Sequence, residues 1–445
     1  MKGKYIGIGL CLVVIVIIVC LGIVYLRQEN NIPEKNISEI IGTVIQITGN
    51  QVVLETDDNT NHTFNMSNTK FNIGDSIKVQ HAEDKAVIAY EVIAVDEVYT
   101  KIPDTWKDNG IFSRYYSKAY KTLGELTLDE KIGQIILVKF PQTDGIQEVK
   151  EYSFGGYIFY GKDFNSKSKE QVISMIQNVQ KNSKIPLLTA VDEEGGLVVR
   201  VSGNPNLVSS KFKSVSDIYN IGGLNAIKED TLAKSKILSE LGLNLNLAPV
   251  IDVATNPSDY MYDRTIQQDT QITAEYAQTV VNASKNTGVS YTLKHFPGYG
   301  NNMDTHIGSS TDYKSYENIL KEDIPPFEAG IKAGAEAIMV SHNIVASIDK
   351  ENPACLSKSI NNILREDLNF TGIIITDDLD MKAVSSISDV AAKAILAGND
   401  LIITKDYKKS FDSIKKAIDD GLLKEEDINR LAFRIIAWKY YKGLL

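Results

Sequence analysis

The sequence predicts an α/β protein, a TIM-like (β/α)8 barrel preceded by a transmembrane helix and a small all-β domain. Three observations lead to this prediction: an uncharged apolar run near the N-terminus, a stretch of β-branched alternation, and eight later apolar segments separated by helix-like stretches. The chain of 445 residues is long enough for two or three domains. A hydrophobic content of 43% and a charged content of 23% are those of a folded globular protein.

The first element is the run of residues 5–26, which contains no charged residue. As a helix it would span about 33 Å, enough for a bilayer core of about 30 Å. Lys2 and Lys4 precede the run and Arg27 follows it, which favours the N-terminal side in the cytoplasm. A cleaved signal peptide would have a shorter apolar region and a small-residue cleavage site. We therefore expect a single-pass membrane anchor at residues 5–26, with the rest of the chain outside the cytoplasm.

Two further regions follow the apolar run. Residues 27–40 are polar and predict a tether. Residues 41–98 show β-branched alternation, and Gly49-Asn50 is a turn signal between the first two strands. We expect a small antiparallel β-barrel there. Its histidines form no cluster that suggests chemistry, so a spacer or interaction module is the simplest interpretation.

From residue 107 to residue 445, strand-like and helix-like segments alternate. The eight apolar segments are IGQIILVKF, GGYIFY, IPLLTAVD, NLNLAPVID, VSYTLKHF, EAIMVSH, GIIITDD and NDLIITK. Stretches such as SKEQVISMIQNVQKN between them have the composition of surface helices. Parallel strands covered by helices give this pattern, and eight such units suit a (β/α)8 barrel. A doubly wound open sheet is the alternative.

Composition argues against several classes of function. Lys and Arg number 47 against 57 Asp and Glu, a net charge of −10, so we expect no nucleic-acid partner. Three cysteines, two of them in the apolar run, cannot form a disulfide framework or a cysteine-based metal site. A metallohydrolase would need paired histidine ligands, whereas His295 follows Lys294, whose ammonium group would repel a cation. We therefore expect no metal and no cofactor.

Ionisable residues gather at the carboxyl ends of the predicted strands, where such barrels build their active sites. They are Asp192, Asp252, Lys294, His295, His342, Asp377 and Asp378. A single aspartate there is often only a helix cap, but several ionisable groups on one rim would share a partly desolvated space. Retaining glycoside transfer fits, because it needs a carboxylate nucleophile and a proton donor roughly 5–5.5 Å apart. Asp377 can be the nucleophile if a cation lowers its pKa, and the donor could be Asp, Glu or His.

Seven motifs in the same order resemble glycoside hydrolase family 3, in its β-N-acetylglucosaminidase (NagZ-type) branch. They are LTLDEKIGQ, GGYIFY, AVDEEGGLVVR, NLAPVIDVATNP, KHFPGYG, PACLSKSI and GIIITDDLDM. The ending RLAFRIIAWKYYKGLL is similar to the family's last helix. The resemblance extends from about Leu126 to Leu445, and it implies a glycoside hydrolase family 3 (β/α)8 catalytic domain over residues 107–445.

The resemblance also implies roles for particular residues. Asp377 aligns with the family's nucleophile, which would attack the anomeric carbon and form a covalent glycosyl-enzyme. We expect Asp378 to be structural and His342 to have a hydrogen-bonding role. The residues that align with the family's sugar-binding positions are Asp192, Arg200, Arg264, Lys294 and His295.

The branch carries an Asp-x-His motif downstream of KHFPG, which here is Asp304-Thr305-His306. His306 would be the general acid/base, because an imidazole has a reference pKa of about 6.5, and Asp304 would orient it. The segment GYGNNMDTH is one residue shorter than the family's usual spacing, and Tyr299 replaces a common histidine. One deletion is tolerable if the loop moves during the catalytic cycle.

These inferences predict a retaining exo-β-N-acetylglucosaminidase (β-N-acetylhexosaminidase) that acts on cell-wall-derived glycans or muropeptides with a terminal N-acetylglucosamine. The acetamido preference comes from the resemblance alone. Three alternatives stay open: a β-N-acetylglucosaminide phosphorylase, a family 3 β-glucosidase, and a non-catalytic wall-binding protein. Phosphorolysis is among them because a neutral histidine repels an anion less than a carboxylate does. The natural glycan and the oligomeric state cannot be inferred from the sequence.

Overall fold

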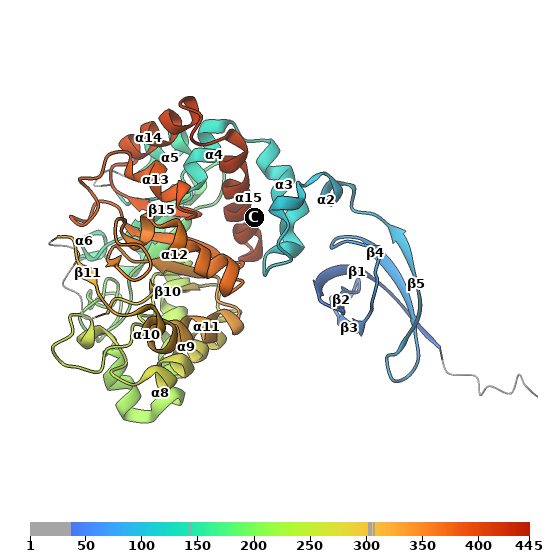
Figure 1. The fold of residues 1–445 in the computed structure, drawn as a ribbon, viewed down its shortest axis with the longest axis horizontal. Helices are drawn as coiled ribbons and strands as arrows, with labels where there is room; N and C mark the ends of the chain where they lie inside the picture. The colour runs from blue at the N-terminus through green and yellow to red at the C-terminus, as the bar shows by residue number, and fades with distance from the viewer. Residues whose placement is uncertain (1–36, 142, 144, 301–304, 306–307) are drawn as a thin grey trace, which may run out of the picture. The chain divides into compact units, whose positions relative to one another are not determined.

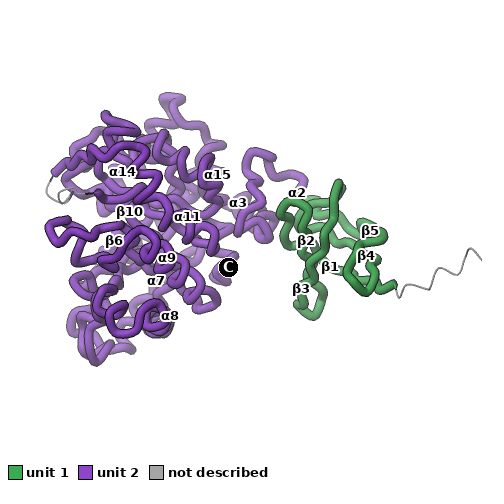
Figure 2. The backbone as a smooth tube through the Cα atoms, turned by 60° about the horizontal axis from the view of Figure 1, so that its bottom comes forward, with its two compact units in different colours: residues 1–99 green, residues 100–445 purple. Residues whose placement is uncertain are grey.

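The computed structural model describes residues 37–445, except residues 142, 144, 301–304, 306 and 307. The predicted anchor at residues 5–26 and the predicted acid/base pair, Asp304 and His306, lie outside the described residues. The chain divides into two compact units, one ending at Tyr99 and the other extending from Thr100 to Leu445 (Figure 2).

Five antiparallel strands form the sheet of the first unit. They are β1 (Ser38–Thr48), β2 (Gln51–Glu55), β3 (Asn61–Asn65), β4 (Ser76–His81) and β5 (Val87–Ala94), in the order β3-β2-β1-β4-β5. Alternate residues are buried, as in Val52 and Leu54 of β2 or Ile77 and Val79 of β4, which is the period of a strand with one covered face. The predicted all-β character is therefore confirmed. The strands form an open sheet with edges at β3 and β5, and not the small barrel expected for residues 41–98, since no pairing joins β3 to β5 among the described strands.

Eight parallel strands of the second unit close into a barrel (Figure 1). In sequence order they are β6 (Ile136–Lys139), β7 (Gly156–Phe159), β8 (Leu188–Val191), β9 (Leu245–Asn246), β10 (Ser290–Phe296), β12 (Ala337–Val340), β14 (Ile373–Asp378) and β15 (Leu401–Thr404). Each strand pairs with the next, and β15 pairs with β6 to complete the ring. Every predicted apolar segment contains one strand. The TIM-like barrel is thus confirmed, and the open sheet is excluded.

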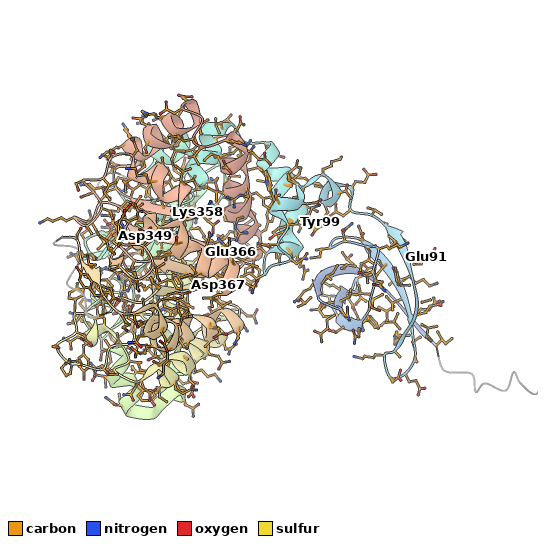
Figure 3. The ribbon with its side chains drawn as sticks, viewed as in Figure 1. Glu91, Tyr99, Asp349, Lys358, Glu366 and Asp367 are labelled. Carbon is orange, nitrogen blue, oxygen red and sulfur yellow. The ribbon has the colours of Figure 1, made fainter. Side chains whose placement is uncertain are left out.

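Helices connect the strands and cover the outside of the barrel. The main ones are α3 (Tyr116–Gly124), α4 (Leu128–Gln134), α5 (Ile146–Tyr152), α7 (Lys169–Asn182), α8 (Val215–Leu241), α9 (Thr270–Ser284), α11 (Ile324–Lys332), α12 (Lys358–Asn362), α13 (Val390–Leu396), α14 (Tyr407–Asp419) and α15 (Glu425–Tyr441). Shorter helices are α2 (Glu97–Lys101), α6 (Gly161–Phe164) and α10 (Tyr316–Asn318), and β11 (Thr311–Asp312) pairs with β13 (Ile344–Val345). Charged side chains such as Lys358, Glu366 and Asp367 are exposed on the surface (Figure 3).

Helix α7 shows why the sequence forms these helices. The hydroxyl of Ser168 accepts the backbone N–H of Gln171, whose side chain accepts the N–H of Ser168 in return. Its buried residues, Val172, Ile176 and Val179, follow at helical spacing and face the barrel layer.

The expected localisation, a single-pass membrane protein with an extracytoplasmic catalytic domain, is corrected. No helix in the described part of the chain is long and apolar enough to cross a bilayer. The longest, α8, carries Lys228, Asp230 and Lys236 and packs beside α7 and α9. The localisation depended on hydropathy and length in residues 5–26 alone, and these lie outside the described residues.

Candidate active site

A cavity of about 710 Å³ lies at the carboxyl ends of the barrel strands. The predicted nucleophile and all five predicted sugar-binding residues line it: Asp377, Asp192, Arg200, Arg264, Lys294 and His295. They come from four segments of the chain, namely the loop after β8, the turn at 262–264, the end of β10 and the end of β14, so the barrel brings together residues that the sequence places far apart. This end of the barrel is where such folds carry their active sites.

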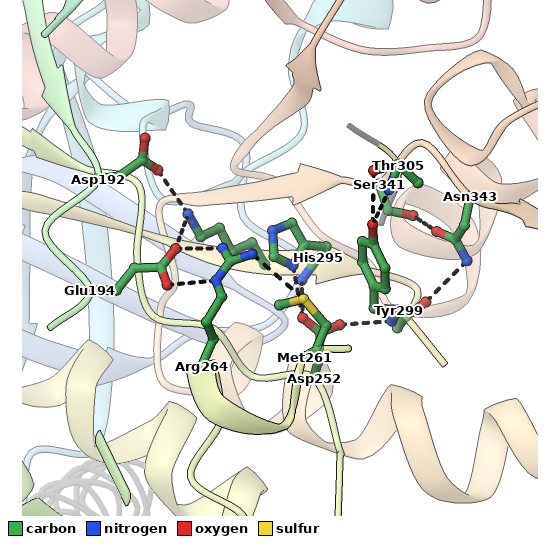
Figure 4. A network of polar contacts seen from close by, with 12 residues as sticks. Asp192, Glu194, Asp252, Met261, Arg264, His295, Tyr299, Thr305, Ser341 and Asn343 are labelled. Carbon is green, nitrogen blue, oxygen red and sulfur yellow. Dashed lines mark hydrogen bonds and ion pairs between the residues drawn. The ribbon is translucent and has the colours of Figure 1, made fainter. Parts of the chain in front are cut away.

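Lys294 lies between two carboxylates in this cavity. Its Nζ is 2.8 Å from Oδ1 of Asp192 and 2.7 Å from Oε1 of Glu194 (Figure 4). Arg264 donates to both oxygens of Glu194, from Nε at 3.0 Å and from Nη2 at 2.7 Å. Burial alone would raise the pKa of Glu194, but the charges of Lys294 and Arg264 hold it well below its usual range. Burial opposes the charge of Lys294 as well, yet Asp192 and Glu194 raise its pKa. The four side chains therefore form a cluster joined by ion pairs.

Glu193 shapes the loop after β8, which carries Asp192, Glu194 and Arg200 of the cavity. Its side chain is fully buried, and Oε2 accepts the backbone N–H groups of Arg200 at 2.8 Å and Val201 at 2.7 Å. Gly195 in the same loop has a φ of 101°, and a Cβ there would lie 2.2 Å from the carbonyl oxygen of Lys213. Only glycine fits this position, so the loop geometry requires a glycine at residue 195.

Asp252 orients His295. Its Oδ2 is 2.8 Å from Nδ1 of His295, and its Oδ1 accepts the backbone N–H of Tyr299 at 2.8 Å. With the carboxylate oxygen as the acceptor, the hydrogen of this bond lies on Nδ1 of His295. Asp252 therefore fixes both the ring and the following turn.

Asp377 lies near the carboxyl end of β14 and faces the cavity. Its Oδ1 accepts the backbone N–H of Asp378 at 2.7 Å. Burial opposes ionisation, but His342, His295, this hydrogen bond and Lys294 together lower the pKa of Asp377. The carboxylate is therefore ionised near neutral pH, as a nucleophile must be.

His342 and Asp378 support this strand end. Nε2 of His342 donates to the carbonyl oxygen of Asp378 at 2.8 Å, and Nδ1 lies 3.1 Å from Sγ of Cys355. Asp378 pairs with Lys139, and its Oδ1 accepts the N–H of Asp380 at 3.0 Å. Burial outweighs the attraction of Lys139 and raises the pKa of Asp378 to about 6. These contacts fit the hydrogen-bonding and structural roles expected for the two residues.

The residue between the predicted acid/base pair is described, although Asp304 and His306 are not. Thr305 is fully buried and lines the same cavity as Asp377. Its side chain and its backbone N–H both contact the hydroxyl of Tyr299. The role of His306 stays a prediction.

The sequence motifs did not identify Glu194 and Tyr160 as contributors to the site. Glu194 and Tyr160 line the cavity, and the cations of Lys139 and Arg200 lie 5.7 Å and 5.8 Å from the ring centre of Tyr160. Glu194 could have been found, because two neighbouring cations in a buried site need a carboxylate between them. Within the described residues, no three or more His, Cys, Asp or Glu side chains are arranged to hold a metal ion.

Residues 127–437 match the family described as "Glycosyl hydrolase family 3 N terminal domain". The chain belongs to glycosyl hydrolase family 3. The match covers the barrel and every predicted site residue, so the resemblance seen in the motifs is confirmed. This member of the family is accordingly a glycoside hydrolase.

Curated relatives carry the name beta-hexosaminidase. One from Xanthomonas campestris pv. campestris is 31% identical over 261 residues, which are 56% of this chain and 76% of the relative. Another from Nitrosomonas eutropha is 30% identical over 298 residues, 66% of this chain and 83% of the relative. A solved family 3 beta-N-acetylglucosaminidase from a Paenibacillus species is 28% identical with a TM-score of 0.67. The alignment covers 72% of this chain and 63% of that one, so the matched part is less than two thirds of the Paenibacillus protein.

Proposed function

We propose that this chain is a retaining exo-β-N-acetylglucosaminidase that removes terminal N-acetylglucosamine from glycans. The observation that carries the proposal is the single cavity in which an ionised Asp377 lies with Asp192, Arg200, Arg264, Lys294 and His295. The names of the relatives support the acetamido sugar as substrate.

The cluster around Lys294 suits a sugar. Hydroxyl groups both donate and accept hydrogen bonds, and the cavity offers carboxylate acceptors beside ammonium and guanidinium donors. Because Asp192, Glu194, Arg264 and Lys294 hold one another in place, these groups need little reorganisation when the sugar enters. Preorganised polar groups of this kind favour the charged transition state of glycoside cleavage.

In the proposed reaction, the carboxylate of Asp377 attacks the anomeric carbon while the bond to the leaving oxygen breaks. His306 gives its proton to that oxygen, and Asp304 stabilises the imidazole. A water molecule then gives a proton to His306 and attacks the anomeric carbon, which releases Asp377. Two displacements at one carbon retain its configuration.

Asp377 and Asp378 provide a matched pair of variants. Asp377→Asn should lower kcat/KM on an aryl β-N-acetylglucosaminide by at least about a thousandfold, because the nucleophile is lost. Asp378→Asn makes the same chemical change one residue away and should cost less than about tenfold, since Asp378 supports the strand end instead of attacking the sugar. The measurement is release of the aryl alcohol by the full chain. Equal losses in the two variants would contradict the assignment of Asp377.

A substrate panel tests the sugar. Cleavage of the aryl β-glucoside alone would replace the acetamido preference with a β-glucosidase activity. If neither the aryl β-N-acetylglucosaminide nor the aryl β-glucoside is cleaved, the result would favour the alternative of a non-catalytic wall-binding protein. The glycan is proposed to derive from cell walls, so a wall disaccharide with terminal N-acetylglucosamine should also release that sugar. Formation of a sugar phosphate in phosphate buffer would identify a phosphorylase instead.

A further inference from the structure

Tyr299 follows the KHFPG sequence at the end of β10, and its side chain is only 3% exposed. It packs in an apolar cluster with Val250, Ala254 and Met261. Its ring centre lies 5.6 Å from that of His295. The position of the phenol is therefore set by packing, before any hydrogen bond is considered.

The backbone of Tyr299 is hydrogen-bonded to the carboxylate that also holds His295. Its N–H donates to Oδ1 of Asp252 at 2.8 Å, and Oδ2 of the same carboxylate lies 2.8 Å from Nδ1 of His295. The side chain of Asp252 thus holds both residues, and a shift of Tyr299 relative to His295 would break one of these two hydrogen bonds.

The hydroxyl of Tyr299 holds Thr305. Its oxygen accepts the backbone N–H of Thr305 at 2.9 Å and lies 2.8 Å from Oγ1 of the same residue (Figure 4). The carbonyl oxygen of Thr305 accepts the N–H of Ala383 at 3.3 Å, from the segment that follows Asp377. Thr305 is completely buried, so its N–H, hydroxyl and carbonyl are all held in place. A phenol can donate one and accept two hydrogen bonds, which suits this double contact.

Thr305 stands directly between Asp304 and His306 in the sequence. Adjacent Cα atoms are about 3.8 Å apart, so fixing one residue limits where its two neighbours can be. We propose that Tyr299, through Thr305, is a positioning residue for the acid/base pair. This inference rests on the proposed function of His306. It goes beyond it by assigning a task to the buried hydroxyl of Tyr299.

Leaving-group dependence separates a positioning role from a structural one. A phenyl leaving group needs protonation as it departs, whereas a dinitrophenyl group leaves readily without it. Tyr299→Phe keeps the ring and removes only the hydroxyl. In the full chain it should lower kcat/KM on the phenyl N-acetylglucosaminide roughly ten- to a hundredfold, as the loss of one or two hydrogen bonds allows. On the dinitrophenyl substrate the loss should stay below about threefold.

Variants of Thr305 and a surface tyrosine complete the experiment. Thr305→Val should behave like Tyr299→Phe, Thr305→Ser should restore most of the rate, and the Tyr299→Phe/Thr305→Val double variant should lose no more than either single one. Tyr313→Phe is the matched control, because Tyr313 is 84% exposed. Equal losses on both substrates in Tyr299→Phe would indicate a general structural defect and overturn the inference.

His306→Ala distinguishes failure of this inference from failure of the proposed function. If His306→Ala loses rate only on the phenyl substrate and Tyr299→Phe does not, the acid/base assignment stands and the positioning role of Tyr299 is wrong. If His306→Ala affects both substrates equally, the acid/base assignment itself fails, and the inference about Tyr299 falls with it.

Discussion

At the residue scale, two adjacent aspartates at the end of β14 have opposite electrostatic environments. The imidazoles of His342 and His295 help to lower the pKa of Asp377 against the effect of burial. Burial raises the pKa of Asp378 to about 6, even though Lys139 is paired with it. Below about pH 6 the carboxyl group of Asp377 is therefore still ionised while that of Asp378 carries a proton. The lowered pKa suits Asp377 to attack the sugar, and the contacts of Asp378 suit it to support the strand end.

The pH dependence of activity follows from this difference. Because its pKa is raised, Asp378 keeps its proton up to about pH 6, and the ion pair with Lys139 is lost as the pH falls through that value. Lys139 lines the cavity, so kcat/KM should rise as the pH increases through about 6. Asp378→Asn should lack this rise, whereas Asp377 is already ionised there. The profile of kcat/KM from pH 4.5 to 7.5 checks this, and a rise that persists in Asp378→Asn would belong to another group.

At the element scale, the strands could be predicted because each is a short apolar segment with polar residues at its ends. Contacts between distant segments could not be predicted. Lys294 and Asp192 are 102 positions apart, and only the closed barrel shows that Glu194 joins them. The break in α8 at Gly222 and Gly223 was likewise not foreseen. Hydropathy in residues 5–26 led to a wrong localisation, because an apolar run by itself does not establish a membrane span.

The start of α7 gives a prediction about a single helix. Ser168→Ala removes the hydroxyl that accepts the N–H of Gln171, and should lower the free energy of unfolding by about 1 kcal/mol. Ser174→Ala is the matched control, since Ser174 is exposed inside the same helix and alanine has the higher helix propensity. Urea unfolding followed by tryptophan fluorescence measures both. A destabilisation of Ser174→Ala as large as that of Ser168→Ala would contradict the capping role.

At the scale of the whole molecule, a hydrogen bond joins the last helix of the barrel unit, α15, to the early helix α4. Lys439 near the end of α15 donates from Nζ to Oε1 of Gln134 at 2.7 Å, across 305 positions. Gln134 ends α4, and its Nε2 donates to the carbonyl oxygen of Ser153 at 2.6 Å. Lys439 is fully buried, and burial alone lowers its pKa to about 7. The last helix is thus joined to α4 by a lysine that is largely uncharged above that pH.

This lysine makes the stability of the barrel unit depend on pH. In the unfolded chain Lys439 keeps its proton up to its ordinary value of 10.5, whereas in the fold it loses the proton above about pH 7. The unfolded state binds more protons in that interval, so this residue makes the free energy of unfolding rise with pH from 7 towards 10.5, by at most about 1.4 kcal/mol per pH unit. This increase in the free energy of unfolding is lost again as the pH falls from 10.5 to 7.

Lys439→Met should remove that slope, while Lys415→Met, at a partly exposed lysine of α14, should keep it. The two tryptophans of the chain, Trp106 and Trp438, both belong to the second unit, so their fluorescence during urea unfolding reports on the barrel alone. Loss of the hydrogen bond to Gln134 lowers the stability of Lys439→Met by a similar amount at every pH. The slope of the free energy of unfolding against pH therefore tests the pKa of Lys439, whereas its absolute value does not. Parallel curves for the parent and Lys439→Met between pH 7 and 9.5 would show that Lys439 retains its proton in the folded barrel.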